Sequence, residues 1–255
     1  MALEQRRGIQ SIDTGIRLLE ALERADGPLA LKDLSACAEM APSNAHRYLA
    51  SFMRAGLVLQ GEDSRYDFGP FALRLGLSAM RRADPVKAAE RALPALVAET
   101  GRAALLCVWS NRGPTVVHLE RSNNTVFTNL GLGSVLPVAR SSLGRILLAF
   151  LPESVTAETL ALEAERDKID RTWLEREIAR ARKTRLTYAD KAVNPGLYAT
   201  ASVVLGWNGE AVCAVALIGS DAALAKADNP AALALRETCT RLSREAGARD
   251  FDNAA

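Results

Sequence analysis

Hydrophobic residues recur at intervals of three and four over residues 9–24, a spacing that predicts an amphipathic helix. The Asp-Gly-Pro sequence at 26–28 ends this helix, because these residues favour a turn over a helix interior. A second short helix is predicted over residues 29–40. Pro42 suits the first turn of a third helix, whose pattern extends to Gly56, a residue type that commonly follows a helix C-terminus. The chain is therefore predicted to begin with three short helices.

A pair of short strand-like stretches comes next. Residues 57–60 (LVLQ) and 65–69 (RYDFG) flank a turn-rich Gly-Glu-Asp-Ser tetrad, which predicts a two-stranded hairpin. Helical spacing returns over residues 70–83 and stops before Asp84 and Pro85, where we place the boundary between two domains. Three helices followed by a hairpin are typical of a winged helix-turn-helix, whose third helix enters the major groove of DNA.

Beyond residue 85 the pattern alternates helices with pairs of strands that are joined by tight turns. Asn208-Gly209 suits the type I′ turn of a hairpin, and Ser141 or Ser142 suits the N-terminal cap of a helix. Because the strands are paired directly, the pattern favours an antiparallel α+β domain over a Rossmann fold. The predicted elements are helices over 86–100, 141–150 and 230–247, a helix opened by a capping box at Thr172 and Glu175, strands over 103–110, 115–122 and 126–130, and a hairpin over 199–219.

The charge of the chain is nearly balanced. Its 255 residues carry a net charge of +2, and residues 1–82 hold 11 Lys/Arg against 10 Asp/Glu, so a nucleic-acid surface has to be local. The four cysteines are far apart and the only histidines are His46 and His118, so neither a metal site nor a cofactor is predicted. No apolar segment reaches the roughly 18 residues that a membrane span needs, and no signal peptide opens the chain. We expect a cytoplasmic protein with buried, reduced cysteines and no membrane partner.

The third predicted helix has two unlike faces. Ala45, Leu49 and Phe52 gather on one side, whereas the opposite side carries no carboxylate between Ala41 and Arg54. The major groove is about 12 Å wide and admits a helix whose outward side chains are small or basic. The sequence therefore predicts that this helix reads base edges in DNA.

Single residues on this helix and in the hairpin suit particular contacts. Arg47 fits a guanine and Asn44 an adenine, because each forms two hydrogen bonds with that base, whereas Ser43 or Arg54 suits a phosphate. Arg65, in the hairpin, is placed to reach a neighbouring phosphate backbone or the minor groove. One reading helix recognises too few base pairs, so we expect at least a homodimer on a pseudo-palindromic double-stranded DNA operator. The candidate DNA-binding residues are Ser43, Asn44, His46, Arg47, Arg54 and Arg65.

Stretches from both halves of the chain carry a family resemblance. The N-terminal half contains IQSIDTGIRLLEAL, PLALKDLSACAEMAPSNAHRYLASFMRAGLV and SRYDFGPFALRLG, and the C-terminal half contains GSVLPVARSSLGRILLAFLP and NPGLYATASVVLGWNGEAVCAVALIG. In this order they resemble the IclR family of bacterial transcriptional regulators. The resemblance implies an N-terminal all-α winged helix-turn-helix and a C-terminal α+β effector-binding domain with a GAF/profilin-like antiparallel sheet, assembled as a homodimer or homotetramer. The implied domains are 1–69 for DNA binding, 70–84 as a linker helix and 85–255 for effector binding.

The segment GLGSVLP and the SSLGR that follows it place glycine-rich backbone close to a helix N-terminus. Free N–H groups and the positive end of that helix suit a carboxylate, with Ser141 and Ser142 as additional donors. The resemblance implies an effector cavity lined by this segment and the closing hairpin. We expect a small organic acid with an apolar or aromatic body and not a dicarboxylate, because Ala199, Ala216 and Ile218 offer no polar side chain to a second acid group. The candidate effector-binding residues are Leu132, Gly133, Ser134, Ser141, Ser142, Ala199, Thr200, Ala216 and Ile218.

Two other classes of function compete with this interpretation. An enzyme needs a nucleophile with its base, a set of metal ligands or a phosphate loop, but the sequence has no G-x-x-x-x-G-K-[ST], G-x-S-x-G or H-E-x-x-H motif. A thiol enzyme on a similar sensor fold needs paired cysteines, which the spacing does not provide. A small-molecule sensor whose winged helix contacts only proteins requires no operator, so a gel shift with the chain's own upstream DNA separates it from a regulator.

Overall fold

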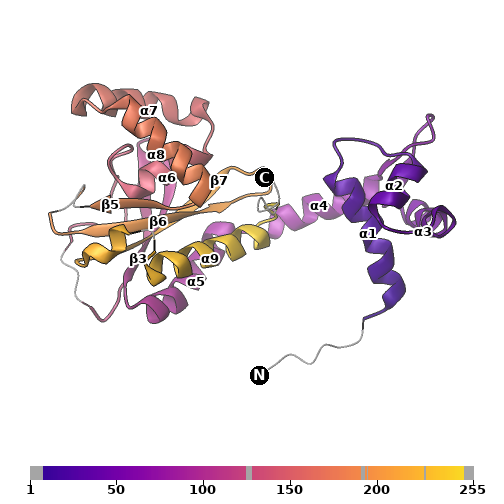
Figure 1. Ribbon diagram of the computed structural model, residues 1–255, viewed down its shortest axis with the longest axis horizontal. Helices are drawn as coiled ribbons and strands as arrows, with labels where there is room; N and C mark the ends of the chain where they lie inside the picture. The colour runs from indigo at the N-terminus through magenta and orange to yellow at the C-terminus, as the bar shows by residue number, and fades with distance from the viewer. Residues whose placement is uncertain (1–7, 125–127, 191–192, 194, 227, 250–255) are drawn as a thin grey trace. The chain divides into compact units, whose positions relative to one another are not determined.

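The chain divides into two compact units, Met1–Ala83 and Asp84–Ala255 (Figure 1). Each unit has its own hydrophobic core. Because each unit has its own core, its fold is described separately from that of the other unit. The computed structural model describes residues 8–124, 128–190, 193, 195–226 and 228–249.

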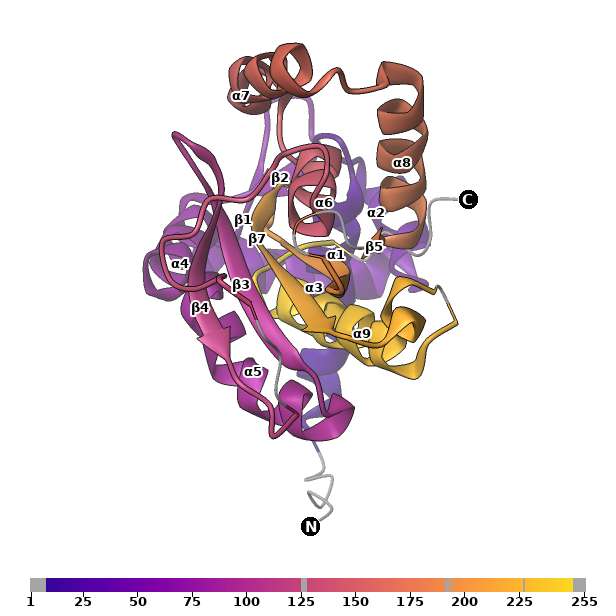
Figure 2. The same cartoon turned by 90° about the vertical axis from the view of Figure 1, so that its left-hand side faces the viewer.

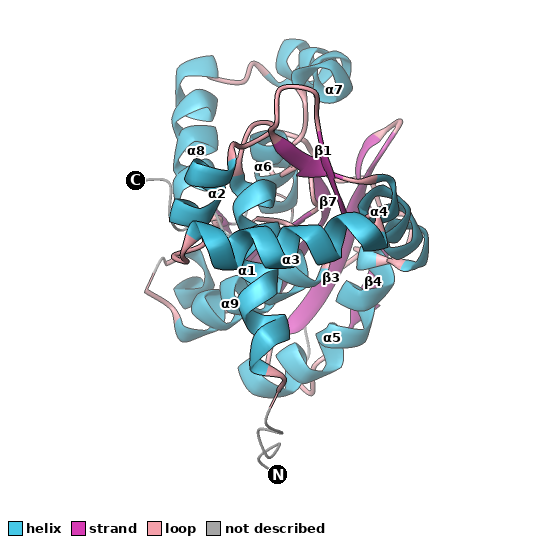
Figure 3. Cartoon of the chain, turned by 90° about the vertical axis from the view of Figure 1, so that its right-hand side faces the viewer, coloured by secondary structure: helices cyan, strands magenta, loops and turns pink. Residues whose placement is uncertain are grey.

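The N-terminal unit begins with three helices and a small hairpin (Figure 3), and these elements share one hydrophobic core. Leu18, Leu34 and Leu49, one from each helix, are fully buried, and Val58 and Tyr66 of the hairpin complete the core. Helices this short are marginal in water by themselves, so the shared apolar core is what stabilises them. The elements are α1 (Gln10–Arg24), α2 (Leu31–Cys37), α3 (Pro42–Ala55), β1 (Val58–Gln60), β2 (Tyr66–Phe68) and α4 (Pro70–Arg82).

Backbone contacts fix the hairpin and α3 relative to the other helices of this unit. Tyr66 of β2 exchanges two backbone hydrogen bonds, of 2.8 and 3.0 Å, with Leu29 in the connection between α1 and α2. α3 begins at Pro42 and ends before Gly56, whose φ of 71° lies in the left-handed region that glycine adopts without strain. The hairpin is therefore held to the connection between α1 and α2, and the C-terminal end of α3 is fixed by Gly56.

The C-terminal unit is built on a five-stranded sheet with strand order β4-β3-β7-β6-β5, and all of its paired strands are antiparallel (Figure 2). Successive side chains point to opposite faces, so each central strand divides its apolar residues between two cores. On β7, Ala214, Ala216 and Ile218 face one core, whereas Val215 and Leu217 face the other. The strands are β3 (Ala103–Ser110), β4 (Gly113–Glu120), β5 (Thr187–Asp190), β6 (Tyr198–Leu205) and β7 (Ala211–Gly219).

Helices cover both faces of this sheet. α5 and α9 pack on one face, α6 and α8 lie on the other, and α7 lies farther from the sheet than α6 (Figures 1 and 2). This layering leaves the start of α6 directly over the sheet, where the sequence places its candidate effector site. The helices are α5 (Pro85–Thr100), α6 (Ser142–Phe150), α7 (Glu153–Asp167), α8 (Arg171–Thr184), the 3₁₀ helix η1 (Ala222–Ala225) and α9 (Pro230–Glu245).

α7, β5 and the short η1 occur where the sequence pattern predicted no element, and one predicted cap is wrong. α7 buries only Thr156 and Glu163, so it has no apolar stripe for a periodicity argument to detect. β5 is four residues long and lies at the edge of the sheet, which is too short for a clear alternation. The cap of α8 is Asp170, whose carboxylate accepts the Trp173 N–H at 3.1 Å, and Thr172 lies inside the helix.

The strand predicted over 126–130 falls partly outside the described residues, which omit 125–127. Residues 128–130 have no regular secondary structure. Further along, the backbone of Ser134 accepts a hydrogen bond of 2.9 Å from Val116, and Gly133 donates one of 2.8 Å to Val116. The glycine-rich segment therefore pairs with the outer edge of β4.

Candidate functional site

The outer face of α3 is exposed along its length. Ala45 and Leu49 have no exposed surface, and they hold the helix against the core of the N-terminal unit. The Arg47 guanidinium has no hydrogen bond or ion pair with any described residue, whereas Arg54 donates to the Ser51 hydroxyl at 3.4 Å. The helix thus carries a guanidinium without a partner among the described residues at the centre of its exposed face. The candidate residues that are exposed on α3 are Ser43, Asn44, His46, Arg47 and Arg54.

Arg65 is held more firmly than the sequence suggested. Its guanidinium lies 3.5 Å from the Asp63 carboxylate and donates to the backbone carbonyl of Pro28 at 3.3 Å. The Asp63 carboxylate also accepts the Arg65 backbone N–H at 3.2 Å. These contacts neutralise part of the positive charge at the hairpin, so a phosphate contact by Arg65 has to replace them.

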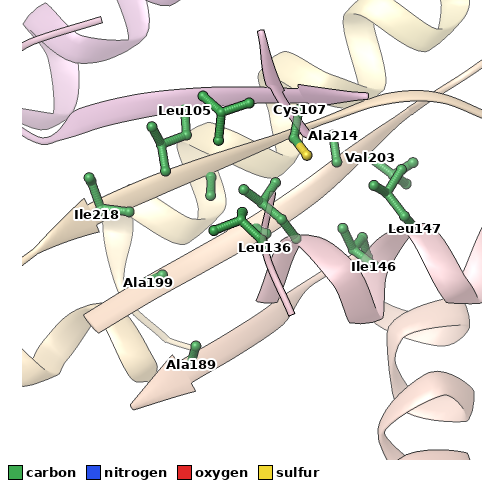
Figure 4. Packing of buried hydrophobic residues seen from close by; sticks show 14 of the residues in the cluster. Leu105, Cys107, Leu136, Ile146, Leu147, Ala189, Ala199, Val203, Ala214 and Ile218 are labelled. Atoms are coloured by element: carbon green, nitrogen blue, oxygen red, sulfur yellow. The ribbon is translucent and has the colours of Figure 1, made fainter. Parts of the chain in front are cut away.

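A pocket lies between the start of α6 and the sheet in the C-terminal unit (Figure 4). It contains about 350 Å³ of space not filled by atoms, part of it open to solvent. Its lining is apolar except at the helix start, where the serines are found. The candidate residues that the structure brings together here are Ser141, Ser142, Ala199, Ala216 and Ile218.

Four other candidate residues do not line this pocket. Leu132 is 75% exposed, and the N–H groups of Gly133 and Ser134 donate to Val116 and Gly131. Thr200 is fully buried, but strand alternation directs it to the opposite face of the sheet from its neighbour Ala199. An effector in the pocket therefore meets the start of α6 and not the amides of the glycine-rich segment.

The first turn of α6 has unused donors. The Ser141 hydroxyl caps the helix by accepting the Gly144 N–H at 2.8 Å, and it donates to the Pro137 carbonyl at 2.6 Å. The N–H groups of Ser142 and Leu143 and the Ser142 hydroxyl make no hydrogen bond within the described part of the chain, and both residues line the pocket. Uncapped N–H groups at a helix N-terminus favour a bound anion.

Close packing fixes the position of this helix start. A side chain at Gly144 would collide with the backbone carbonyls of Pro137 and Val138, so only glycine lets α6 approach the preceding segment this closely. The Glu163 carboxylate of α7 accepts the backbone N–H groups of Val138 and of Ala139, the latter at 2.9 Å. Glu163 could not be identified from the sequence, because nothing local shows which backbone N–H groups a distant carboxylate will meet.

Arg145 also stabilises the segment that precedes α6. Its guanidinium is 3% exposed and donates to the carbonyls of Ala139 and Arg140, at 2.9 and 2.8 Å, and to the carbonyl of Tyr188 on β5. Burial lowers the pKa of Arg145, and the Glu177 carboxylate, 3.7 Å from Nε, opposes that shift. Arg145 is therefore a structural cation that ties α6 to β5 and not an open binding group.

The buried thiols are unsuited to nucleophilic chemistry. Burial raises the pKa of Cys107 to about 12 and also raises the pKa values of Cys213 and Cys239. A nucleophilic cysteine requires the thiolate, which is scarcely populated at neutral pH under these conditions. Among the described residues there is also no group of three or more His, Cys, Asp or Glu side chains that could hold a metal ion. No helix in the described segments is both long and apolar enough to cross a membrane.

Three helices followed by a hairpin, with the exposed face of the third helix free of acidic side chains, form the arrangement of a winged helix-turn-helix DNA-binding regulator. Family comparisons agree with this class. The model of the IclR helix-turn-helix domain matches residues 11–62, and that of the C-terminal domain of bacterial IclR transcriptional regulators matches residues 77–244. The chain therefore belongs to the IclR family of transcriptional regulators and is not an enzyme.

Individual relatives support the same family over most of the chain. The probable transcriptional regulator SauR of Cupriavidus necator is 28% identical over 209 residues, which cover 79% of this chain and 82% of SauR. The crystal structure of Pseudomonas aeruginosa HmgR is 30% identical, covers 95% of this chain and all of that chain, and superposes with a TM-score of 0.80. An IclR homologue from Microbacterium hydrocarbonoxydans, solved in complex with 4-hydroxybenzoate, shares the fold at 20% identity and a TM-score of 0.52, covering 92% of this chain and 98% of that chain. The predicted fold class is confirmed.

Proposed function

We propose that a small organic acid with an apolar or aromatic body controls DNA binding by this regulator from the pocket over the sheet. The observation that carries the proposal is the pairing of unused donors at Ser142 and Leu143 with an apolar lining. Such a pocket, apolar with a few polar anchors at one end, suits a compact acid. The 4-hydroxybenzoate bound by the Microbacterium homologue is compatible with this class of ligand.

We further propose that α3 reads the operator and that the linker helix α4 separates the two functional domains, 1–69 for DNA and 85–255 for the effector. Arg47 then contacts a base, while Ser43, Asn44, His46 and Arg54 position α3 on the duplex. The uncommitted state of Arg47 supports its part in this assignment, because no internal contact has to be broken before it binds. Arg65 is assigned a weaker, phosphate-directed role, since Asp63 already holds it.

Assembly can be tested through two helices with exposed apolar side chains. α4 has no buried residue and exposes Leu73, Leu77 and Met80, and α1 exposes Ile12 and Ile16. Exposed apolar stripes of this kind mark interaction surfaces, and a two-fold operator requires a two-fold protein. We predict that light scattering finds a dimer or tetramer at micromolar concentration, and that Leu77→Glu shifts it toward monomer.

Leu162→Glu on α7 is the matched control, because it places the same charge on a leucine that is also exposed, 66% against 51% for Leu77, but lies outside α1 and α4. It is expected to leave the assembly unchanged. A stable wild-type monomer whose footprint covers one half-site contradicts the assembly proposal.

The effector class is tested by titration calorimetry with benzoate, glyoxylate and succinate. Benzoate is expected to bind. Ala199→Asp is expected to lower the affinity for benzoate by about tenfold or more, because the new carboxylate repels the ligand in an apolar pocket. Thr200→Val is the control, since this neighbouring side chain faces away from the pocket and its hydroxyl has no hydrogen-bond partner among the described residues. Tight binding of glyoxylate or succinate without any response to aromatic acids would contradict the proposal, and unchanged binding in Ala199→Asp would remove Ala199 from the site.

A further inference from the structure

A row of mostly small side chains crosses the sheet beneath the effector pocket. Ala189 pairs with Ala199, Ala199 with Ile218, and Ile218 with Ala103, so these residues stand side by side on four successive strands. All of them belong to the core on the α6 side, and Figure 4 shows Ala189, Ala199 and Ile218 in line. Because neighbouring strands lie about 4.8 Å apart, the part of the row from Ala199 to Ala103 extends about 10 Å. It forms a low apolar floor that continues past the pocket.

A second cavity lies at the far end of this row. It holds about 500 Å³ of space not filled by atoms, part of it open to solvent, and Ala103, Leu119, Arg121 and Thr128 help to line it. Ile218 lines both this cavity and the effector pocket. The two spaces therefore adjoin along the same face of the sheet.

Arg121 supplies a positive charge in the second cavity. The side chain is exposed and makes no ion pair or hydrogen bond with the described residues. The adjacent Glu120 is directed to the opposite face, where its carboxylate lies 3.4 Å from His118. The Asp221 carboxylate, just after β7, is bound to Arg102 at 2.6 Å. Both of these carboxylates thus already have partners, and the Arg121 guanidinium, which has none among the described residues, is left to bind an anion from solution.

We propose that Arg121 is the second anchor of the effector site and that the effector is an elongated acid with an anionic oxygen at each end. This inference rests on the proposed function, because the first carboxylate occupies the start of α6 beside Ser142. The apolar body lies over Ala199 and Ile218, and the second anionic group pairs with Arg121. Dicarboxylates are then expected to bind poorly only if they are too short to reach Arg121. The second carboxylate of such a short acid stays over the apolar side chains without a partner.

Two isomers of equal charge distinguish the effect of the spacing between the carboxylates from the effect of the charge itself. Benzene-1,4-dicarboxylate holds its carboxylates at opposite ends of a rigid ring, whereas benzene-1,2-dicarboxylate holds them next to each other. By calorimetry on the full chain, we expect the 1,4-isomer to bind more tightly than benzoate and the 1,2-isomer to bind more weakly. Arg121→Gln is expected to weaken the 1,4-isomer by about tenfold, the usual size of a lost charged hydrogen bond, and to change benzoate affinity by less than about twofold.

Arg112→Gln is the matched control, because Arg112 is an exposed arginine in the turn between β3 and β4 and does not line either space. It is expected to change neither affinity. Equal effects of Arg121→Gln on benzoate and on the 1,4-isomer, or no effect on either, overturn the second anchor while leaving an acid effector in place. If neither benzoate nor the 1,4-isomer binds the wild-type protein, the organic-acid effector itself is wrong and the second anchor falls with it.

Discussion

Arg47→Ala is expected to weaken binding to the specific operator by about 1–3 kcal/mol per reading helix, while binding to a scrambled duplex changes far less. The reason is that the Arg47 guanidinium is exposed at the centre of the α3 face and has no internal partner among the described residues. A two-pronged contact with guanine carries sequence information, and alanine removes it without disturbing the buried side of the helix. Gel shifts on the specific and scrambled sites measure the two affinities.

Arg65→Ala provides the comparison. Because Arg65 is held by Asp63 and Pro28 at the hairpin, its loss is expected to reduce the slope of log affinity against log salt by at most about 1 and to keep the sequence preference. Equal weakening on both duplexes by Arg47→Ala would show that Arg47 contacts a phosphate and not a base.

Glu163→Ala is expected to lower the unfolding free energy of the C-terminal unit by about 2–4 kcal/mol, because it leaves the buried N–H groups of Val138 and Ala139 without acceptors. Glu163→Gln keeps one acceptor oxygen, so a smaller loss is expected. All three tryptophans, Trp109, Trp173 and Trp207, follow residue 84, so their fluorescence in a denaturant titration reports on this unit alone.

Glu165→Ala is the control for charge and helix propensity, since Glu165 lies exposed on the same helix without an ion pair among the described residues. It is expected to change stability by less than about 0.5 kcal/mol. A Glu163→Ala variant as stable as Glu165→Ala would mean that water replaces the carboxylate and that α7 does not hold the segment before α6.

Local periodicity was enough to predict the surfaces that depend on one element. The small and basic face of α3 follows from helical spacing, and the structure exposes it because Ala45 and Leu49 fix which side is buried. The cap at Ser141 and the end of α3 at Gly56 are likewise decided by neighbouring residues. These features need no knowledge of the rest of the fold.

Features that depend on distant partners could not be predicted in this way. The amides of Gly133 and Ser134 look free in the sequence, but they are used by β4 and by a turn. Glu163 reaches the segment before α6 only because α7 is packed there. The placement of Thr200 is different, because a strand cannot point Ala199 and Thr200 to the same face, so alternation alone would have excluded one of them from the pocket.

The central claim is that an acid bound over the sheet changes the affinity of the regulator for its operator. The direct test is fluorescence anisotropy of the full chain on its own upstream DNA, with and without benzene-1,4-dicarboxylate, in the wild type and in Ala199→Asp. We predict that the acid shifts wild-type operator affinity by about fivefold or more, whereas Ala199→Asp binds the same DNA but no longer responds to the acid. Operator affinity that is the same with and without acid, under conditions where calorimetry shows the pocket saturated, would contradict it.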